Sequence, residues 1–269
     1  MNNAGINFTS HMTSNGFLFS NKIIQKAIRN WHLEKVQITL DGTENVYNKT
    51  KAYINNEGNP YQKVLHNIKL LLNHNIDVII RLNLSQNNYS DLVTLVKELS
   101  ILYGTHKNIK IYPTPLFELY KDETIRKVIF KKLLELQNFI EMQGMELGYS
   151  YFHKIRLNHC KADNNLKSVV VFPNGNIGLC EHELDSKYIG NVWDFGSLNK
   201  NFVNEWSVYI PPQKSCSDCF LYFDCLKLKK CETNNSCYKE VIENDIHLIK
   251  SQMLKKYKEY ETKIQDTDQ

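Results

Sequence analysis

Cysteine is absent from the first 159 residues of this 269-residue chain, and all seven cysteines follow in the remaining part. The chain also lacks the run of about 18 apolar residues that a membrane-spanning helix needs, which excludes a transmembrane protein. Residues 1–7 lack the charged start and apolar core of a secretory signal, so we expect a cytoplasmic protein. No long basic run accompanies the net charge of +4, which argues against nucleic-acid binding.

The cysteines are spaced as metal ligands are. Two residues separate the first closely placed pair, and five residues separate each of the next three cysteines from the one before. An odd number suits a disulfide framework poorly, and disulfides are uncommon in the cytosol. Thiolates this close converge readily on iron–sulfur clusters or on structural zinc, and spacing alone leaves both open. The seven are Cys160, Cys180, Cys216, Cys219, Cys225, Cys231 and Cys237.

The first half of the chain alternates short apolar runs with helical patterns, which predicts an α/β fold with a parallel sheet and right-handed crossovers. About four βα units are expected before residue 150, enough for part of a barrel or for an open sheet. The expected strands are 6–9, 36–40, 78–84 and 109–112, and the expected helices are 23–31, 60–73, 89–103 and 123–143.

The character of the sequence changes near Ser150, so we expect one domain over 1–149 and a second over 150–269. In the second, 173–176 predicts a hairpin turn between strands 169–172 and 177–179. The region 216–237 has few apolar residues of its own, so a cofactor should organise it. A charged helix is expected over 238–262.

Three polar residues, Asn15, Asp41 and Arg81, fall at or near the carboxyl ends of expected strands. In barrels this rim builds the active site. An ordinary turn at Asp41 and a salt bridge at Arg81 are the alternatives that the residues themselves leave open.

The cysteine block resembles a SPASM domain, the C-terminal extension of many radical S-adenosylmethionine enzymes that holds auxiliary [4Fe–4S] clusters. Cys160, Gly175 and Cys180 reproduce the first part of the family pattern, and the block from Cys216 reproduces the second. The interval from Cys225 to Cys231 is longer than is usual in the family.

The first half is similar to the middle of the radical S-adenosylmethionine barrel. Ser14-Asn15-Gly16 resembles the family's Thr-Asn-Gly turn, residues 38–43 resemble its Ser-Leu-Asp-Gly-Thr strand end, and residues 80–83 resemble its Arg-x-Asn strand. In order and spacing these match the third, fourth and fifth barrel strands. The two resemblances together imply a partial radical S-adenosylmethionine barrel followed by a SPASM domain.

One departure from the family is severe. The Cys-x-x-x-Cys-x-x-Cys loop, which binds the cluster that cleaves S-adenosylmethionine, is absent. The resemblance therefore implies a fragment or one half of a split peptide- or protein-modifying enzyme. S-adenosylmethionine would be used only with a separate N-terminal half, and a peptide or protein would be the substrate.

The resemblance also assigns residues. It implies one auxiliary cluster on Cys160, Cys180 and Cys231, and another on Cys216, Cys219, Cys225 and Cys237. It also implies that Asn15, Thr39, Asp41 and Arg81 contact S-adenosylmethionine. Thr39 occupies a position where relatives often have serine.

In some relatives an acidic residue at the position of Glu181 can take a proton from the substrate, which makes Glu181 the candidate catalytic residue; a surface glutamate is its alternative. Two other functions remain open for the whole chain. They are a non-catalytic iron–sulfur or peptide-binding module and a structural zinc protein.

Overall fold

The structure is a computed structural model that describes Gly5 and residues 7–54, 58–116, 119, 123–148, 168–179, 188–194, 199 and 201, with 254, 257, 258, 260 and 261 near the C-terminus. The chain divides into two compact units. One comprises Met1–Tyr151 with His247–Gln269, and the other Phe152–Ile246. The domain limits expected at 149/150 remain a prediction.

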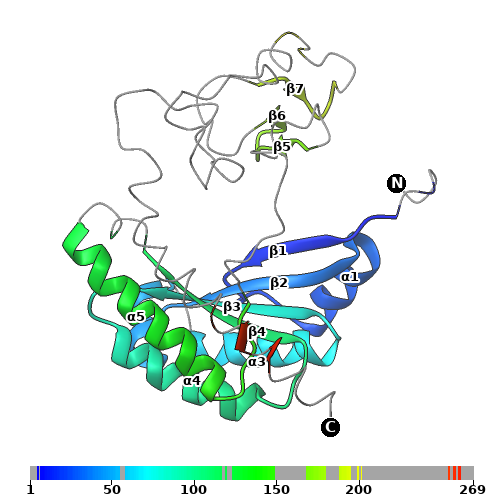
Figure 1. Cartoon of the computed structure of the whole chain (residues 1–269). Helices are drawn as coiled ribbons and strands as arrows, with labels where there is room; N and C mark the ends of the chain where they lie inside the picture. Colours follow the sequence, from blue (N-terminus) through cyan, green and yellow to red (C-terminus); the bar gives the residue numbers. More distant parts are fainter. Residues whose placement is uncertain are drawn as a thin grey trace, which may run out of the picture. The chain divides into compact units, whose positions relative to one another are not determined.

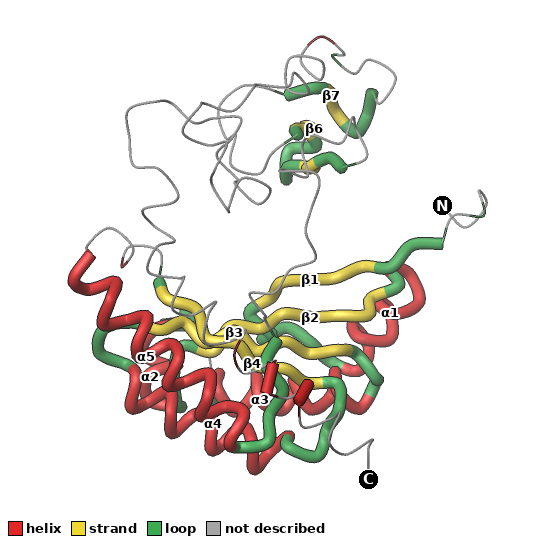
Figure 2. Tube along the Cα trace, in the orientation of Figure 1, coloured by secondary structure: helices red, strands yellow, loops and turns green. Residues whose placement is uncertain are grey.

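The first unit contains a four-stranded, fully parallel sheet in the order β1-β2-β3-β4 (Figures 1 and 2). This confirms the α/β class and the parallel sheet expected from the alternating pattern. The strands are β1 (Ser10–Ser14), β2 (Leu33–Leu40), β3 (Asp77–Leu84) and β4 (Ile109–Pro115).

In the part of the chain that the structure describes, helices α1 to α5 connect and flank the strands, and α3, α4 and α5 lie together on one side of the sheet (Figure 1). Sequence signals explain their starts: Ser20 and Asn59 cap α1 and α3 by accepting from Ile23 N and Gln62 N. Gly144, at φ +75°, follows the last turn of α5 as expected. The helices are α1 (Asn21–Trp31), α2 (Glu44–Lys51), α3 (Pro60–Asn73), α4 (Tyr89–Tyr103) and α5 (Glu123–Met142).

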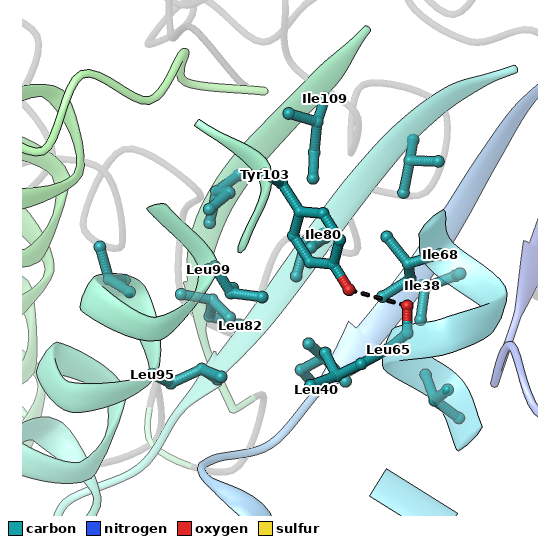
Figure 3. Close-up of a cluster of buried hydrophobic side chains, with 14 of the residues drawn as sticks. Ile38, Leu40, Leu65, Ile68, Ile80, Leu82, Leu95, Leu99, Tyr103 and Ile109 are labelled. Carbon is teal, nitrogen blue, oxygen red and sulfur yellow. Dashed lines mark hydrogen bonds between the residues drawn. The ribbon is translucent and has the colours of Figure 1, made fainter. Parts of the chain in front are cut away.

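The core lies between this sheet and its helices. Alternate residues of each strand point into it, including Ile38, Ile80 and Ile111, all fully buried. Figure 3 shows Tyr103 of α4 directing its hydroxyl at the Leu65 carbonyl of α3, an interaction of 2.7 Å that ties the two helices together. The residues between the core positions form the opposite face, which carries Thr39 and Arg81.

Two leucines one turn apart on α4 test this arrangement. Leu99 is fully buried, whereas Leu102 is 46% exposed. We expect Leu99→Ala to lower the free energy of unfolding by about 2–5 kcal/mol, because it leaves a cavity in the core. Leu102→Ala, the matched control, should lower it by less than about 1 kcal/mol. Urea denaturation measures both, and equal losses would contradict the packing.

Three sequence expectations need correction. The first strand is Ser10–Ser14 and not 6–9, because pairing with β2 selects a polar segment that has no apolar run. Helix α2 was not expected, since Tyr47 is its one buried residue. Strand β4 does not stop before Pro113 but continues to Pro115.

The continuation of β4 has a physical reason. Both backbone polar groups of Ile111 point away from β3. Its N–H donates to Glu146 O and its carbonyl accepts from Gly148 N, each at 2.9 Å. Alternation places the backbone nitrogens of Pro113 and Pro115 on that same outer side. The missing N–H groups therefore remove no hydrogen bond to β3.

The second unit contains a small antiparallel sheet of β5 (Val170–Val171), β6 (Asn176–Gly178) and β7 (Gly190–Asn191). The expected hairpin at 173–176 is confirmed. Gly175 N donates to Phe172 O at 2.9 Å, and Gly175 adopts φ +83°, a conformation that glycine tolerates without strain. Residues 257, 258, 260 and 261 are helical, while most of the helix expected over 238–262 lies outside the described residues.

Candidate functional site

The candidate site lies at the carboxyl ends of β2 and β3. Thr39 and Arg81 are register partners on neighbouring strands, and Asp41 directly follows β2. The structure thus brings together three of the residues that the sequence singled out. Asn15 follows β1, is exposed, and accepts from Phe17 N at 3.1 Å, which makes it part of a turn. A pocket described by the structure lies elsewhere, at the amino ends of these strands around Leu33 and Ile76.

Asp41 is the most buried charged group of the site, at 8% exposure. Asn83 Nδ2 donates to its Oδ1 at 2.7 Å. Its Oδ2 accepts no directional hydrogen bond but lies 2.7 Å from Lys51 Nζ, so an ion pair provides its partner. The cation and the amide beside this carboxylate hold it in one orientation.

Asn88 connects the loop after β2, which carries Asp41, to the end of β3, which carries Asn83. Its Nδ2 donates to Asn83 O at 2.8 Å and to Asp41 O at 3.3 Å, and its Oδ1 accepts from Ser85 N at 2.7 Å. One carboxamide therefore satisfies backbone groups of two neighbouring strand ends. It holds those ends in register at the place where the candidate residues lie.

Asp91, in the first turn of α4, fixes the residues that follow Asp41. Its two oxygens accept from Thr43 N at 2.8 Å and from Thr43 Oγ1 at 2.6 Å. The carboxylate comes so close that a Cβ on Gly42 would lie 2.2 Å from Asp91 Oδ2. Glycine at position 42 is therefore a steric requirement of this contact.

The loop after β1 is held by a buried amide. Asn67 of α3, 3% exposed, donates from Nδ2 to Gly16 O at 2.9 Å and to Phe17 O at 3.1 Å. Gly16 itself adopts φ +76°. The Ser-Asn-Gly segment is thus a fixed turn at the edge of the site.

Two buried polar atoms of β3 have no hydrogen-bond partner among the described residues: Arg81 Nε and Asn83 Oδ1. One is a donor and the other an acceptor, and they belong to residues two apart, on the same face of the strand. Unsatisfied buried groups are unfavourable, and a bound ligand or water that pairs with them removes the penalty.

Three buried tyrosines of the first unit remain neutral far into alkaline pH. Burial raises the pKa of Tyr47, with its hydrogen bond to Tyr53 adding to the effect. Burial likewise raises the pKa of Tyr61, which donates to Glu98 Oε2 at 2.8 Å, and that of Tyr103.

These shifts predict alkaline instability. Above pH about 10 the unfolded chain releases phenolic protons that the folded chain keeps, so the unfolding free energy should fall by about 1.4 kcal/mol per pH unit per tyrosine. Below that pH the contribution is fully present. Urea denaturation between pH 9 and 11 measures the slope, and Tyr61→Phe should make it shallower. A flat profile to pH 11 would contradict this account.

Sequence reasoning missed Lys51 and the positioning amides Asn67 and Asn88. Lys51 lies ten residues beyond Asp41, at the end of a helix that was not expected, so nothing in the pattern linked the two. Asn83 was part of the strand motif, but no role was assigned to it.

The seven cysteines and Glu181 lie outside the described residues, so their ligand roles remain predictions. Within the described part, no group of three or more His, Cys, Asp or Glu side chains is placed to hold a metal ion. Among those same residues, no helix has both the length and the apolarity to cross a bilayer.

The fold is similar to that of radical SAM/SPASM enzymes. Among solved structures, anSMEcpe with bound AdoMet and Cp18Cys peptide matches with a TM-score of 0.56 at 15% identity, over 93% of this chain and 77% of that one. The complex with AdoMet and Kp18Cys peptide gives the same values. The histidine-tagged protein with AdoMet matches over 76% of its length, also at 15% identity and a TM-score of 0.56. The name anSME denotes an anaerobic sulfatase-maturating enzyme. No protein-family model and no curated protein matches the chain.

Proposed function

We propose that this chain is a radical SAM/SPASM peptide- or protein-modifying enzyme, or a part of one, and that it binds auxiliary [4Fe–4S] clusters. The observation that carries the proposal is the cluster of Thr39, Asp41 and Arg81 at one edge of a sheet whose fold is similar to an AdoMet-bound enzyme. Since that likeness concerns fold alone, the chemistry rests on this chain's residues.

The described residues fit S-adenosylmethionine as a ligand. Its ammonium and ribose hydroxyls suit the Asp41 carboxylate and Thr39, and its carboxylate suits Arg81, whose Nε has no hydrogen-bond partner in the described part of the chain. Asn15 lies at the rim of the same edge. When bound beside a reduced cluster, this cofactor supplies a radical that abstracts hydrogen from a substrate. The task of these side chains is to bind the cofactor and orient it.

The chain does not fit the cluster that cleaves S-adenosylmethionine. Residues 1–159 contain no cysteine, so the thiolate triad would have to come from another segment or a separate N-terminal half. We therefore derive no cleavage step for this chain.

The thiolate set does fit auxiliary clusters. We assign Cys160, Cys180 and Cys231 to one and Cys216, Cys219, Cys225 and Cys237 to the other, as the family pattern implies. A cluster with three protein thiolates leaves one iron site for another ligand. Glu181, which directly follows Cys180 in the sequence, would accept a proton from the substrate.

A second function, a non-catalytic iron–sulfur or peptide-binding module, is favoured by the absence of cysteine from the barrel half. The two functions differ in one result. Formation of 5′-deoxyadenosine when a triad-bearing N-terminal half is supplied supports the enzyme, and its absence supports the module.

Cofactor binding tests the proposal directly. In equilibrium dialysis, Asp41→Asn should weaken S-adenosylmethionine binding to the iron-loaded chain about tenfold or more, because it removes a charge-assisted interaction. Asp77→Asn is the matched control, since Asp77 is exposed at the amino end of β3. If the unmodified chain binds no S-adenosylmethionine even when a triad-bearing N-terminal half is supplied, the proposed cofactor site is wrong.

A further inference from the structure

The two faces of the parallel sheet have opposite chemistry. The helix-covered face carries buried aliphatic residues, whereas the opposite face of β2, β3 and β4 carries, around the single aliphatic residue of β3 on that side, Ile79, the polar residues Gln37, Thr39, Arg81, Asn83 and Tyr112. Each of these five is partly buried and none is exposed. Parallel sheets are ordinarily apolar on both faces because helices cover both, so a polar face indicates that something other than a helix lies against it.

A hydrogen bond crosses the middle of this polar face. The Tyr112 hydroxyl of β4 donates to Gln37 Oε1 of β2 at 3.0 Å and so passes over β3, which lies between the two strands. Tyr112 is the register partner of Arg81, and Gln37 is the register partner of Ile79. The Tyr112–Gln37 hydrogen bond therefore lies beside Arg81. Arg81 is two residues before Asn83 on β3, so this hydrogen bond lies further from the carboxyl ends of the strands than the Asp41–Asn83 pair.

The tyrosine ring is held firmly in place. A Cβ on Gly148 would lie 3.4 Å from Tyr112 Cδ1 and 3.1 Å from Ile79 Cγ2, so the backbone after α5 lies close to the ring. Burial raises the pKa of Tyr112, which keeps the phenol protonated and able to donate. This fixes Gln37 in turn: with its oxygen directed at Tyr112, its NH₂ group must point elsewhere on the polar face.

Gln37 thus presents a neutral, oriented donor on the same face of the sheet as the two atoms of β3 that have no partner among the described residues. The Nε of Arg81 is a second donor, and Asn83 Oδ1 is an acceptor. A neutral NH₂ suits a neutral carbonyl better than a carboxylate, which the guanidinium would attract. Among the ligands of the proposed function, a peptide offers one such carbonyl at every residue.

We propose that the Gln37 carboxamide, positioned by Tyr112, binds a backbone carbonyl of the peptide substrate on the polar face of the sheet. This inference rests on the proposed function and adds a substrate contact to it. Gln37 touches the peptide, whereas Tyr112 acts through Gln37 as a positioning residue. The subsite is separate from Asp41, so peptide and cofactor affinities should respond to different substitutions.

Peptide binding to the iron-loaded full chain, with S-adenosylmethionine present, tests the subsite. The probe is the capped tripeptide N-acetyl-Ala-Cys-Ala-amide, measured by calorimetry. Gln37→Glu keeps the acceptor for Tyr112 but replaces the NH₂ donor by an anion, so binding should weaken about tenfold. Tyr112→Phe should weaken it several-fold and leave S-adenosylmethionine affinity unchanged, which a general loss of structure would not do.

Gln62→Glu is the control, because Gln62 is exposed on α3 and its Nε2 donates to Glu44 Oε2. It should change peptide affinity less than twofold. A chain that binds iron and S-adenosylmethionine but not the peptide, or a Gln37→Glu variant that binds it as tightly as the unmodified chain, overturns the subsite alone. A chain that binds neither iron nor S-adenosylmethionine overturns the proposed function and the subsite with it.

Discussion

Reconstituted with iron and sulfide under strict exclusion of oxygen, the protein should turn brown and bind about eight irons, as two cubane clusters require. A Cys216→Ala/Cys219→Ala variant should retain about four, because it removes two of the four thiolates assigned to one cluster. Iron and sulfide analysis of the purified protein, with the visible absorption near about 400 nm, provides the measurement.

The complementary variant sharpens this result. Cys160→Ala/Cys180→Ala should also leave about four irons, and combining both pairs should leave essentially none. If either pair alone abolished all iron, the seven cysteines would not partition as assigned. Colourless protein carrying stoichiometric zinc would favour the structural zinc alternative and contradict the clusters.

The second large effect is expected at Gly42. Alanine there places a methyl group 2.2 Å from Asp91 Oδ2 and 2.6 Å from Val46 Cγ1, so the β2–α2 loop must move. We expect Gly42→Ala to lower the free energy of unfolding by about 1–3 kcal/mol, as overpacking does. Because the loop carries Asp41, S-adenosylmethionine binding should be lost as well.

A double-mutant cycle separates the clash from other causes. Asp91→Ala removes the clashing oxygen along with two hydrogen bonds to Thr43. If the clash is responsible, adding Gly42→Ala to Asp91→Ala should cost clearly less than Gly42→Ala costs alone. Strictly additive losses in urea denaturation would show that the clash with Asp91 is not responsible and would leave Val46 as the steric obstacle.

Local signals were sufficient for much of the fold. Helix α3 begins with Asn59 and Pro60, a cap and a first-turn proline, and α4 carries apolar residues at helical spacing, so both were predicted with the observed limits. Strand β3 is predicted by its aliphatic residues. In each case the residues that decide the structure are neighbours in the chain.

The expectations from the sequence were wrong where contacts between residues distant in the chain determine the secondary structure. Strand β1 has the sequence Ser-His-Met-Thr-Ser and becomes a strand through pairing with β2. Helix α2 is polar, and contacts such as Asn48 with Asn59 and with the Tyr61 backbone hold it. At the candidate site, position along the strands made Asp41 and Arg81 candidates with a turn and a salt bridge as alternatives, but the cation that pairs with Asp41 could be found only in three dimensions.

The prolines of β4 also limit how this sheet can associate. A strand that added to the outer edge of β4 would find no N–H donor at Pro113 or Pro115. The outer edge of β1, in the described residues, contains no proline and keeps its N–H donors. Fibrils grow when a subunit accepts a neighbour on two opposite borders. With one border capped, association through this sheet would end at a pair, and polymerisation could not propagate.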